Sequence, residues 1–410
     1  MAAVPTEPER ELARLVRAHD RWRGHDCFNL LPSENAVSPR ARRYLASDLA
    51  GRYTLPVETV FHGETIDNSY AGTRYTDAIE ALADAAACRV FRAKRATTRP
   101  LSGHLAALSA LAPLLPRGSK LLAIAPDRGG YDGYAPGFVP ALLGYTVRPL
   151  PAEGPGASVE AAVAVREIHR ERPAAVLLGQ SFFLFPYPLK EIAEAAHAAD
   201  ALVLYDASHV LGLIAGGRFQ DPLREGADVV FGSTHKSFPG PQGGLLYTDR
   251  EDLFDQIAPA LVWRVFDNAH WNRIAGLGQT LLEMERVGAE YAAAVIADAQ
   301  ALARALDERG LPMVAREQGY TQSHQAHLDA GALKARHGIG PGELARRWER
   351  QRLIGDLAGR IGAAEIARWG LSPTDMPRLA DLLYRAGIAK ERVGAEVLAW
   401  RRQFLQLKFA

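Results

Sequence analysis

The sequence predicts an α/β protein in which a large domain with a doubly wound mixed sheet is followed by a smaller α+β domain. Between about residues 75 and 249, short apolar runs alternate with helical patterns. Buried parallel strands need helical crossovers, and this alternation supplies them. A long helical stretch comes next, and the tail beyond residue 311 mixes short strand candidates with helices.

The first expected element is an amphipathic helix that ends near Asp26, with Leu12, Leu15, Val16 and His19 on one stripe. Strands are expected at residues 120–125, 174–179, 201–206, 228–232 and 244–248, and helices at 103–115, 159–170 and 189–199. Residues 273–309 sustain a helical apolar stripe that can link two domains. In the tail, strands are expected at 326–328 and 360–364, and helices at 342–351, 377–386 and 393–407.

Composition excludes several classes of protein. Of the 410 residues, 48% are hydrophobic and 23% are charged, as in an ordinary globular protein. The formal net charge of +1 argues against broad binding to nucleic acid or a membrane surface, because both need a basic excess. No uninterrupted apolar run reaches the roughly 20 residues of a membrane helix. Cys27 and Cys88 lack metal-ligand spacing, so we expect free thiols, no metal and a cytoplasmic protein.

Three polar and glycine-rich groups mark the candidate site, at residues 205–209, 233–236 and 240–244. The first two follow predicted strands, where open α/β sheets bind ligands. Asp206 and Lys236 match pyridoxal 5′-phosphate (PLP) chemistry, in which a lysine forms a Schiff base and a carboxylate keeps the pyridine nitrogen protonated. Alone, Lys236 would more often be a solvated loop residue and Asp206 a turn residue. Together with the glycines, they favour a PLP site.

These residues resemble the core of serine hydroxymethyltransferase and its relatives in the PLP-dependent fold type I, or aspartate aminotransferase, superfamily. Four further segments match in the expected order: residues 31–35 (Leu-Pro-Ser-Glu-Asn), 72–75 (Gly-Thr-Arg-Tyr), 101–104 (Leu-Ser-Gly-His) and 360–362 (Arg-Ile-Gly). The resemblance implies an N-terminal helical arm and active-site segment over residues 1–70. A large PLP-binding domain over 71–285 and a small domain over 286–410 would follow.

The resemblance also implies roles for the residues around the cofactor. Lys236 would hold PLP as a Schiff base and Asp206 would pair with the pyridinium nitrogen. Ser181 and His209 would lie near the phenolic oxygen of the ring. Ser233 and His235, which belong to the same segment as Lys236, would also bind the cofactor.

Two anionic groups would be bound by separate segments. The turn formed by Ser102, Gly103 and His104 opens a predicted helix, so backbone donors there would bind the phosphate. Ser33 and Arg360 would bind the substrate carboxylate, because a guanidinium fork suits a carboxylate.

Several positions depart from the family pattern. Tyr131 stands where the family has a histidine stacked on the PLP ring, and it cannot carry a proton in the neutral range. His104 replaces a usual serine, and Gln242 replaces a usual arginine. The segment that begins at Tyr53 reads Tyr-Thr-Leu-Pro, without the glutamate that serves as acid/base and contacts folate. An insertion through Glu58, His62, Glu64 and Asp67 precedes the match at residues 72–75. One of its acids could substitute for the missing glutamate, or the insertion is simply a surface loop.

These losses fall on the folate side, so tetrahydrofolate is a doubtful cofactor. We expect a threonine or serine aldolase, or a transaldolase of specialised, natural-product metabolism that uses a larger aldehyde, with Tyr53 and Tyr131 among its catalytic residues. Alternatives are a serine or 2-methylserine hydroxymethyltransferase, a PLP-dependent oxidase or decarboxylase, and a non-catalytic PLP-fold binding subunit. The fold type further implies a homodimer or a tetramer of dimers, with residues 266–271 near the partner's phosphate.

Overall fold

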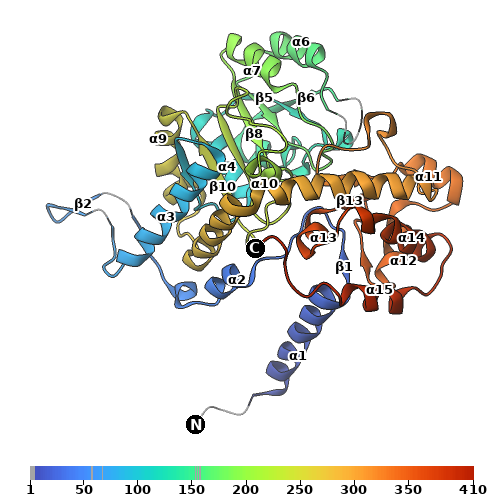
Figure 1. The fold of residues 1–410 in the computed structure, drawn as a ribbon. Coiled ribbons are helices and arrows are strands. Elements are labelled where there is room, and N and C mark those ends of the chain that lie inside the picture. The colour runs from blue at the N-terminus through green and yellow to red at the C-terminus, as the bar shows by residue number, and fades with distance from the viewer. Residues whose placement is uncertain (1–4, 57–58, 67, 153, 155, 157) are drawn as a thin grey trace. The chain divides into compact units, whose positions relative to one another are not determined.

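The computed structural model describes residues 5–56, 59–66, 68–152, 154, 156 and 158–410 (Figure 1). It divides into two compact units. The larger unit comprises residues 33–293 and 322–324, together with the terminal Ala410. The smaller unit comprises residues 1–32, 294–321 and 325–409. The division falls inside one long helix, α10 (Trp271–Glu308), which therefore contributes to both units.

A seven-stranded mixed sheet forms the centre of the larger unit, in the order β4-β10-β9-β8-β7-β5-β6. The strands are β4 (Arg95–Thr97), β5 (Lys120–Ile124), β6 (Thr146–Leu150), β7 (Ala175–Leu178), β8 (Leu202–Asp206), β9 (Val229–Ser233) and β10 (Gly244–Thr248). Strands β5 to β9 pair in parallel, whereas β10 pairs antiparallel with β9 and β4. The carboxyl ends of five parallel strands therefore share one edge, as the sequence predicts for an α/β fold.

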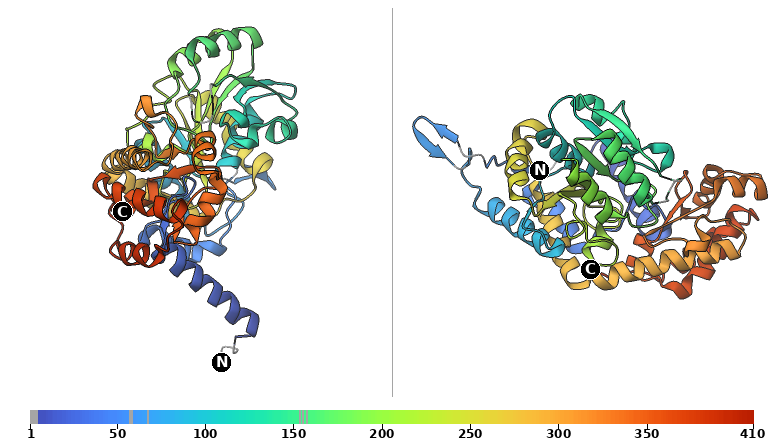
Figure 2. Two further views of the ribbon diagram at one scale, coloured as in Figure 1. Left: turned by 90° about the vertical axis from the view of Figure 1, so that its right-hand side faces the viewer. Right: turned by 90° about the horizontal axis from the view of Figure 1, so that it is seen from above.

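Helices pack around this sheet (Figure 2). They are α2 (Pro39–Leu45), α3 (Arg74–Phe91), α4 (Gly103–Leu114), α5 (Val139–Leu143), α6 (Ala161–Glu171), α7 (Leu189–Ala198), α8 (Leu211–Ala215), α9 (Glu251–Ala260) and the first part of α10. Short turns of helix include η2 (Asp48–Gly51), η3 (Pro126–Arg128), η4 (Asp132–Tyr134) and the π-helical η5 (Leu261–Val265). A hairpin of β2 (Thr59–Phe61) and β3 (Glu64–Ile66) extends from this unit (Figure 1).

The smaller unit combines helices with two short sheets. β1 (Phe28–Asn29) pairs in parallel with β12 (Leu353–Ile354), and β11 (Gln325–His327) pairs antiparallel with β13 (Arg360–Gly362). The helices are α1 (Glu7–Arg21), η1 (Trp22–Asp26), η6 (Arg316–Gln318), α11 (Ala330–His337), α12 (Pro341–Glu349), α13 (Ala364–Trp369), η7 (Pro373–Asp375), α14 (Met376–Gly387), α15 (Gly394–Arg401) and the second part of α10. Their core includes Phe28, Trp348 and Trp400.

Most expected elements form within a few residues of their predicted bounds. The short strands β1, β2, β3 and β12 were not predicted, and neither were two strands of the seven-stranded sheet. These are β4 and β6, which lie at the two edges of the sheet. β6 contains an arginine and a proline, and β4 has only three residues. Edge strands bury less and tolerate proline, so they lack the continuous apolar run that marks a central strand. The last predicted helix is also shorter than expected, because α15 ends at Arg401.

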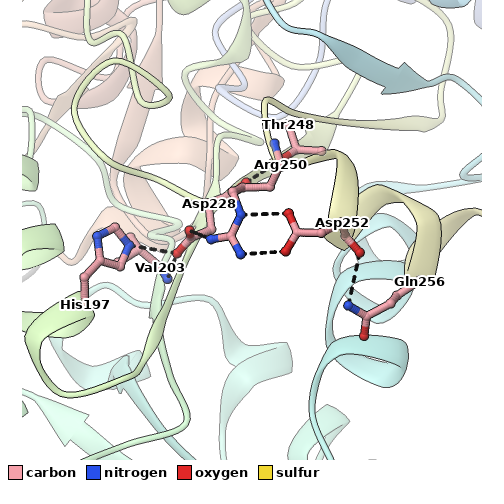
Figure 3. A network of polar contacts seen from close by, with 7 residues as sticks. All are labelled: His197, Val203, Asp228, Thr248, Arg250, Asp252 and Gln256. Atoms are coloured by element: carbon pink, nitrogen blue, oxygen red, sulfur yellow. Dashed lines mark hydrogen bonds and ion pairs between the residues drawn. The ribbon is translucent and has the colours of Figure 1, made fainter.

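A buried carboxylate fastens the amino end of β9 to its neighbours (Figure 3). Asp228, directly before β9, accepts hydrogen bonds from the backbone N–H of Val203 on β8 (2.8 Å) and from His197 Nε2 on α7 (3.0 Å). It also pairs with Arg250 at 3.1 Å, and Arg250 in turn pairs with Asp252 at the start of α9. This network fixes the strands at the end opposite to Ser233. None of the helices in the described ranges has the length and apolar character of a membrane span.

Candidate active site

A pocket lies at the carboxyl ends of the parallel strands in the larger unit. Its lining residues are Gly103, His104, Tyr131, Gln180, Ser181, Asp206, Ser208, His209, Ser233 and Lys236. They come from segments that follow β5, β7, β8 and β9, and from the first turn of α4. Eight of the lining residues are among those that the sequence proposes for the site. The tertiary structure thus brings these eight together in one place.

Asp206 supplies a buried carboxylate to this pocket, with 7% of its surface exposed. Oδ1 accepts a hydrogen bond from the backbone N–H of Ser208 (2.9 Å), and Oδ2 accepts one from the hydroxyl of Tyr134 (2.6 Å). In the described part of the chain no basic side chain forms an ion pair with Asp206. A buried carboxylate is costly without a counter-cation, so this arrangement suits a bound group that carries positive charge.

Lys236 lies beside His209, which in turn stacks on a second histidine. The Nζ atom of Lys236 is 3.5 Å from Nε2 of His209, at the outer limit of hydrogen-bonding distance. The ring of His209 stacks on that of His324, with centroids 5.6 Å apart and planes 22° apart. His324 is fully buried, and the preceding segment is fastened to the larger unit. There the backbone N–H of Gln322 donates to Leu184 O at 2.8 Å.

The start of α4 approaches the end of β9 very closely. Ser102 is the N-cap, and its hydroxyl accepts the backbone N–H of Leu105 at 3.1 Å. A Cβ atom on Gly103 would lie 2.1 Å from Oγ of Ser233, so only glycine fits here without movement. The backbone N–H groups of Gly103 and His104 have no acceptor among the described residues. Free N–H groups at a helix start are suited to an anion such as a phosphate.

Tyr131 and His104 form a pair at the pocket wall. Nδ1 of His104 lies 3.1 Å from the hydroxyl of Tyr131, and the Tyr131 ring packs edge-on against Tyr134. Burial and the nearby charge of Asp206 raise the pKa of Tyr131 above its usual value. Tyr131 therefore keeps its proton at neutral pH, as expected for an aromatic wall that does not titrate there.

The segment around Ser33 contacts the lysine motif through its neighbour Asn35. The Asn35 amide donates to the carbonyl oxygen of Lys236 and lies within hydrogen-bonding distance of the Tyr291 hydroxyl, both at 2.8 Å. The Tyr291 hydroxyl donates to Ser237 O at 2.7 Å. The Ser-Glu-Asn segment and the Lys236 backbone thus form one hydrogen-bonded unit.

The family can be assigned from comparison with known proteins. A family model described as "Serine hydroxymethyltransferase" matches residues 6–331. The chain belongs to the serine hydroxymethyltransferase family. This confirms the resemblance seen in the sequence, and the chain is accordingly a PLP-dependent enzyme of the transferase or aldolase type.

Relatives within and around the serine hydroxymethyltransferase family match nearly the whole chain. The serine hydroxymethyltransferase of Pyrobaculum neutrophilum is 36% identical over 412 residues, which cover 97% of this chain and 94% of that protein. That of Methanopyrus kandleri is 35% identical over 416 residues, covering 98% and 95%. A solved structure, L-threonine transaldolase from Pseudomonas fluorescens in the internal aldimine state, has a TM-score of 0.84 and 25% identity, covering 97% and 93%. The last likeness confirms the fold type I architecture.

The pocket residues fit the PLP expected of a serine hydroxymethyltransferase family member. Lys236 offers an amine to the aldehyde, and Asp206 offers the carboxylate that a pyridinium needs. The free N–H groups at Gly103 and His104 suit the phosphate. Three chemically different groups of PLP thus have a matching partner in one pocket.

Other predicted site residues lie outside the pocket lining. Tyr53 is 40% exposed and donates its hydroxyl to Asp267 Oδ2 at 2.5 Å. His235 is not among the lining residues, and burial next to Lys236 lowers its pKa to about 4. Arg360 belongs to the smaller unit, where its side chain pairs with Asp356. Glu58 and Asp67, two acids of the insertion, lie outside the described residues.

Sequence reasoning missed Gln180 and Ser208 of the pocket lining, and also two side chains that contact lining residues, Tyr134 and His324. Tyr134 belongs to a loop that follows β5, and no spacing connects it with Asp206, 72 residues away. His324 is separated from His209 by the whole of β9, β10 and α10. Both lie in polar or glycine-containing stretches, Tyr-Asp-Gly-Tyr and Thr-Gln-Ser-His-Gln, so no local pattern in the sequence distinguished them. The described residues contain no group of three or more His, Cys, Asp or Glu side chains suited to a metal.

Proposed function

We propose that this protein cleaves the Cα–Cβ bond of a β-hydroxy amino acid, threonine or serine, and passes the glycine unit to a larger aldehyde without tetrahydrofolate. When bound through Lys236, PLP withdraws electrons from a bond at the amino acid Cα. Serine and glycine are substrates that fit the serine hydroxymethyltransferase family as a whole. The larger aldehyde as acceptor and the independence from tetrahydrofolate are specific to this proposal.

The proposal of folate independence rests on the composition of residues 53–56. By resemblance, this segment holds the place of the glutamate that serves as acid/base and contacts folate, yet it contains no carboxylate. Its one titratable side chain, Tyr53, has a pKa raised to about 12 by its hydrogen bond to Asp267. Asn68 fastens the next two residues, since its side chain donates to Thr54 Oγ1 and accepts the backbone N–H of Leu55. The segment therefore offers no carboxylate for proton transfer near neutral pH, and Tyr53 keeps its proton there.

The pocket residues divide the remaining work. His209, at 3.5 Å from Nζ, can take a proton from Lys236 when the amine reacts. Tyr131 covers one wall with a neutral aromatic ring. Ser33 and Arg360 are the proposed ligands of the substrate carboxylate, because holding that group sets which Cα bond is weakened. Similarity to a threonine transaldolase over 97% of the chain supports this reading.

Tetrahydrofolate-dependent hydroxymethyl transfer is the second candidate, with serine or a 2-methyl analogue as substrate. The similarity to the serine hydroxymethyltransferases of Pyrobaculum neutrophilum and Methanopyrus kandleri, at 36% and 35% identity, favours it. For either function we propose a cytoplasmic homodimer or tetramer of dimers, which light scattering during size-exclusion chromatography would measure.

The test is a product assay with purified, PLP-loaded protein. Threonine, serine or glycine is supplied with and without tetrahydrofolate, and with and without an aromatic or sugar aldehyde, and products are identified by mass spectrometry. A new β-hydroxy amino acid formed from threonine and aldehyde in the absence of folate is the expected result. Strict dependence on tetrahydrofolate would refute folate independence, and oxygen consumption with release of carbon dioxide would indicate an oxidase instead.

Lys236→Ala is the matched control for this assay. It should lose both product formation and the visible absorption band that borohydride shifts in the unaltered protein, because no other pocket amine replaces Nζ. Absence of such a band in both proteins would contradict PLP catalysis and favour a non-catalytic binding role.

A further inference from the structure

The hydroxyl of Tyr134 makes a short hydrogen bond with the carboxylate that faces the pocket. The distance to Asp206 Oδ2 is 2.6 Å, within the range of bonds in which a hydroxyl donates to an ionised acceptor. Asp206 accepts one further bond, from the backbone of Ser208. The Ser208 donor is a backbone N–H, which an amino-acid substitution does not remove. Among the described residues, Tyr134 is therefore the side chain whose hydrogen bond can alter the basicity of Asp206.

Packing fixes Tyr134 in the donor position. It is 2% exposed, and its ring lies edge-on against Tyr131 with centroids 5.1 Å apart. Gly179 makes room beneath it, since a Cβ atom there would lie 2.7 Å from Cβ of Asp206 and 3.3 Å from the Tyr134 ring. Burial and the charge of Asp206 raise the pKa of Tyr134 well above its usual value. The proton therefore stays on Tyr134, which acts as donor only.

A donor to a carboxylate stabilises the ionised form and makes the carboxylate a poorer base. Asp206 is the expected partner of the PLP ring nitrogen, and a proton between the two can reside on either. We infer that Tyr134 is a positioning residue that keeps Asp206 ionised and thereby keeps the proton on the ring nitrogen of bound PLP. This inference rests on the proposed use of PLP and adds to it a residue that acts through Asp206.

If Tyr134 had only a structural role, its replacement by phenylalanine should act like the same replacement of another buried tyrosine in that core. Tyr145 is the tyrosine used for this comparison. Tyr145 belongs to the same hydrophobic cluster as Tyr134 and is also buried. Its hydroxyl donates to the backbone oxygens of Leu111 and Leu115, at 2.9 and 2.7 Å. Tyr145→Phe therefore removes a buried hydroxyl from the same core without touching Asp206.

The experiment loads the full-length protein with PLP that is ¹⁵N-labelled in the ring and records the ¹⁵N chemical shift without substrate. Unaltered protein and Tyr145→Phe should give the shift of a protonated ring nitrogen. Tyr134→Phe should move the shift toward that of neutral pyridine. It should also slow exchange of the glycine α-proton in D₂O by roughly tenfold or more, the size expected for a lost bond to a charged group.

A wild-type ¹⁵N shift in Tyr134→Phe would overturn the inference. Failure of the unaltered protein to bind labelled PLP would instead overturn the proposed function, so the two failures are distinguishable. Thermal denaturation checks that both variants fold. Should Tyr134→Phe not fold, 4-fluorophenylalanine at position 134 fills the space of the hydroxyl without donating, and the same change of shift is expected.

Discussion

His209 and His324 stack with their ring planes 22° apart, although they lie far apart in the chain. Nε2 of His209 also lies 3.5 Å from Nζ of Lys236. The orientation of the group beside the reactive amine therefore depends on a side chain from the segment 322–324, which follows η6.

Replacing His324 should reveal this dependence. His324→Ala removes the flat ring and leaves a cavity beside His209, so we expect turnover to fall about tenfold or more, equivalent to about 1.4 kcal/mol. The same cavity should lower the free energy of unfolding by about 2 to 4 kcal/mol. His324→Phe keeps a flat ring and should retain most turnover. Full activity in His324→Ala at a temperature where it is folded would show that the stack does not position His209.

Gly103→Ala should weaken cofactor binding. The added Cβ would meet Ser233 Oγ at 2.1 Å, so the start of α4 must shift away from β9 and carry its free N–H groups with it. Overpacking of this kind costs about 1 to 3 kcal/mol, which corresponds to a PLP dissociation constant about tenfold higher or more. Titration of the visible band measures it. Gly137→Ala, where nothing lies within 4 Å of the added atom, is the control and should bind PLP normally.

Asp298 should make stability fall with rising pH. It is fully buried on α10, no described residue bonds to either carboxylate oxygen, and burial raises its pKa to about 8. Its unfolded pKa is about 3.9, so the folded protein binds the extra proton between these values. The stabilising proton is fully bound below the unfolded pKa and is lost as pH rises through the folded pKa.

Asp298→Asn should remove this pH dependence. Relative to the unaltered protein, the variant should gain on the order of a few kcal/mol between pH 5 and 8, measured by denaturant unfolding. Glu349→Gln changes an exposed carboxylate of the same unit and should follow the unaltered protein. Parallel curves for Asp298→Asn and the unaltered protein would mean that Asp298 is not buried as a neutral acid.

Asp228→Ala should destabilise the larger unit without altering cofactor binding. The change leaves the buried N–H of Val203 without its acceptor and removes the partner of Arg250, at a cost of about 3 kcal/mol. Asp252→Ala, which removes the exposed partner of the same arginine, should cost at most about 1 kcal/mol. The measurement compares the urea midpoints of the two variants. Equal midpoints would show that Asp228 does not stabilise the network drawn in Figure 3 more than Asp252 does.

The sequence by itself determined the family, the α/β class and the central strands. Strand β8, for example, is an apolar run that ends in Asp206, and such runs are visible because a central parallel strand is buried on both faces. Lys236 was likewise identifiable, since its motif is local in the chain. Edge strands β4 and β6 were not, because β4 has only three residues and the largely exposed β6 carries no continuous apolar pattern.

Only the tertiary structure decided which side chains contact Asp206 and His209. Tyr134 reaches Asp206 because the loop after β5 folds over the end of β8, and His324 reaches His209 because residues 322–324 belong to the larger unit although the chain on both sides of them belongs to the smaller one. Each contact joins residues far apart in sequence through strand order and loop path. Periodicity and spacing record local geometry alone, so one sequence cannot disclose contacts that depend on how separate strands are brought side by side.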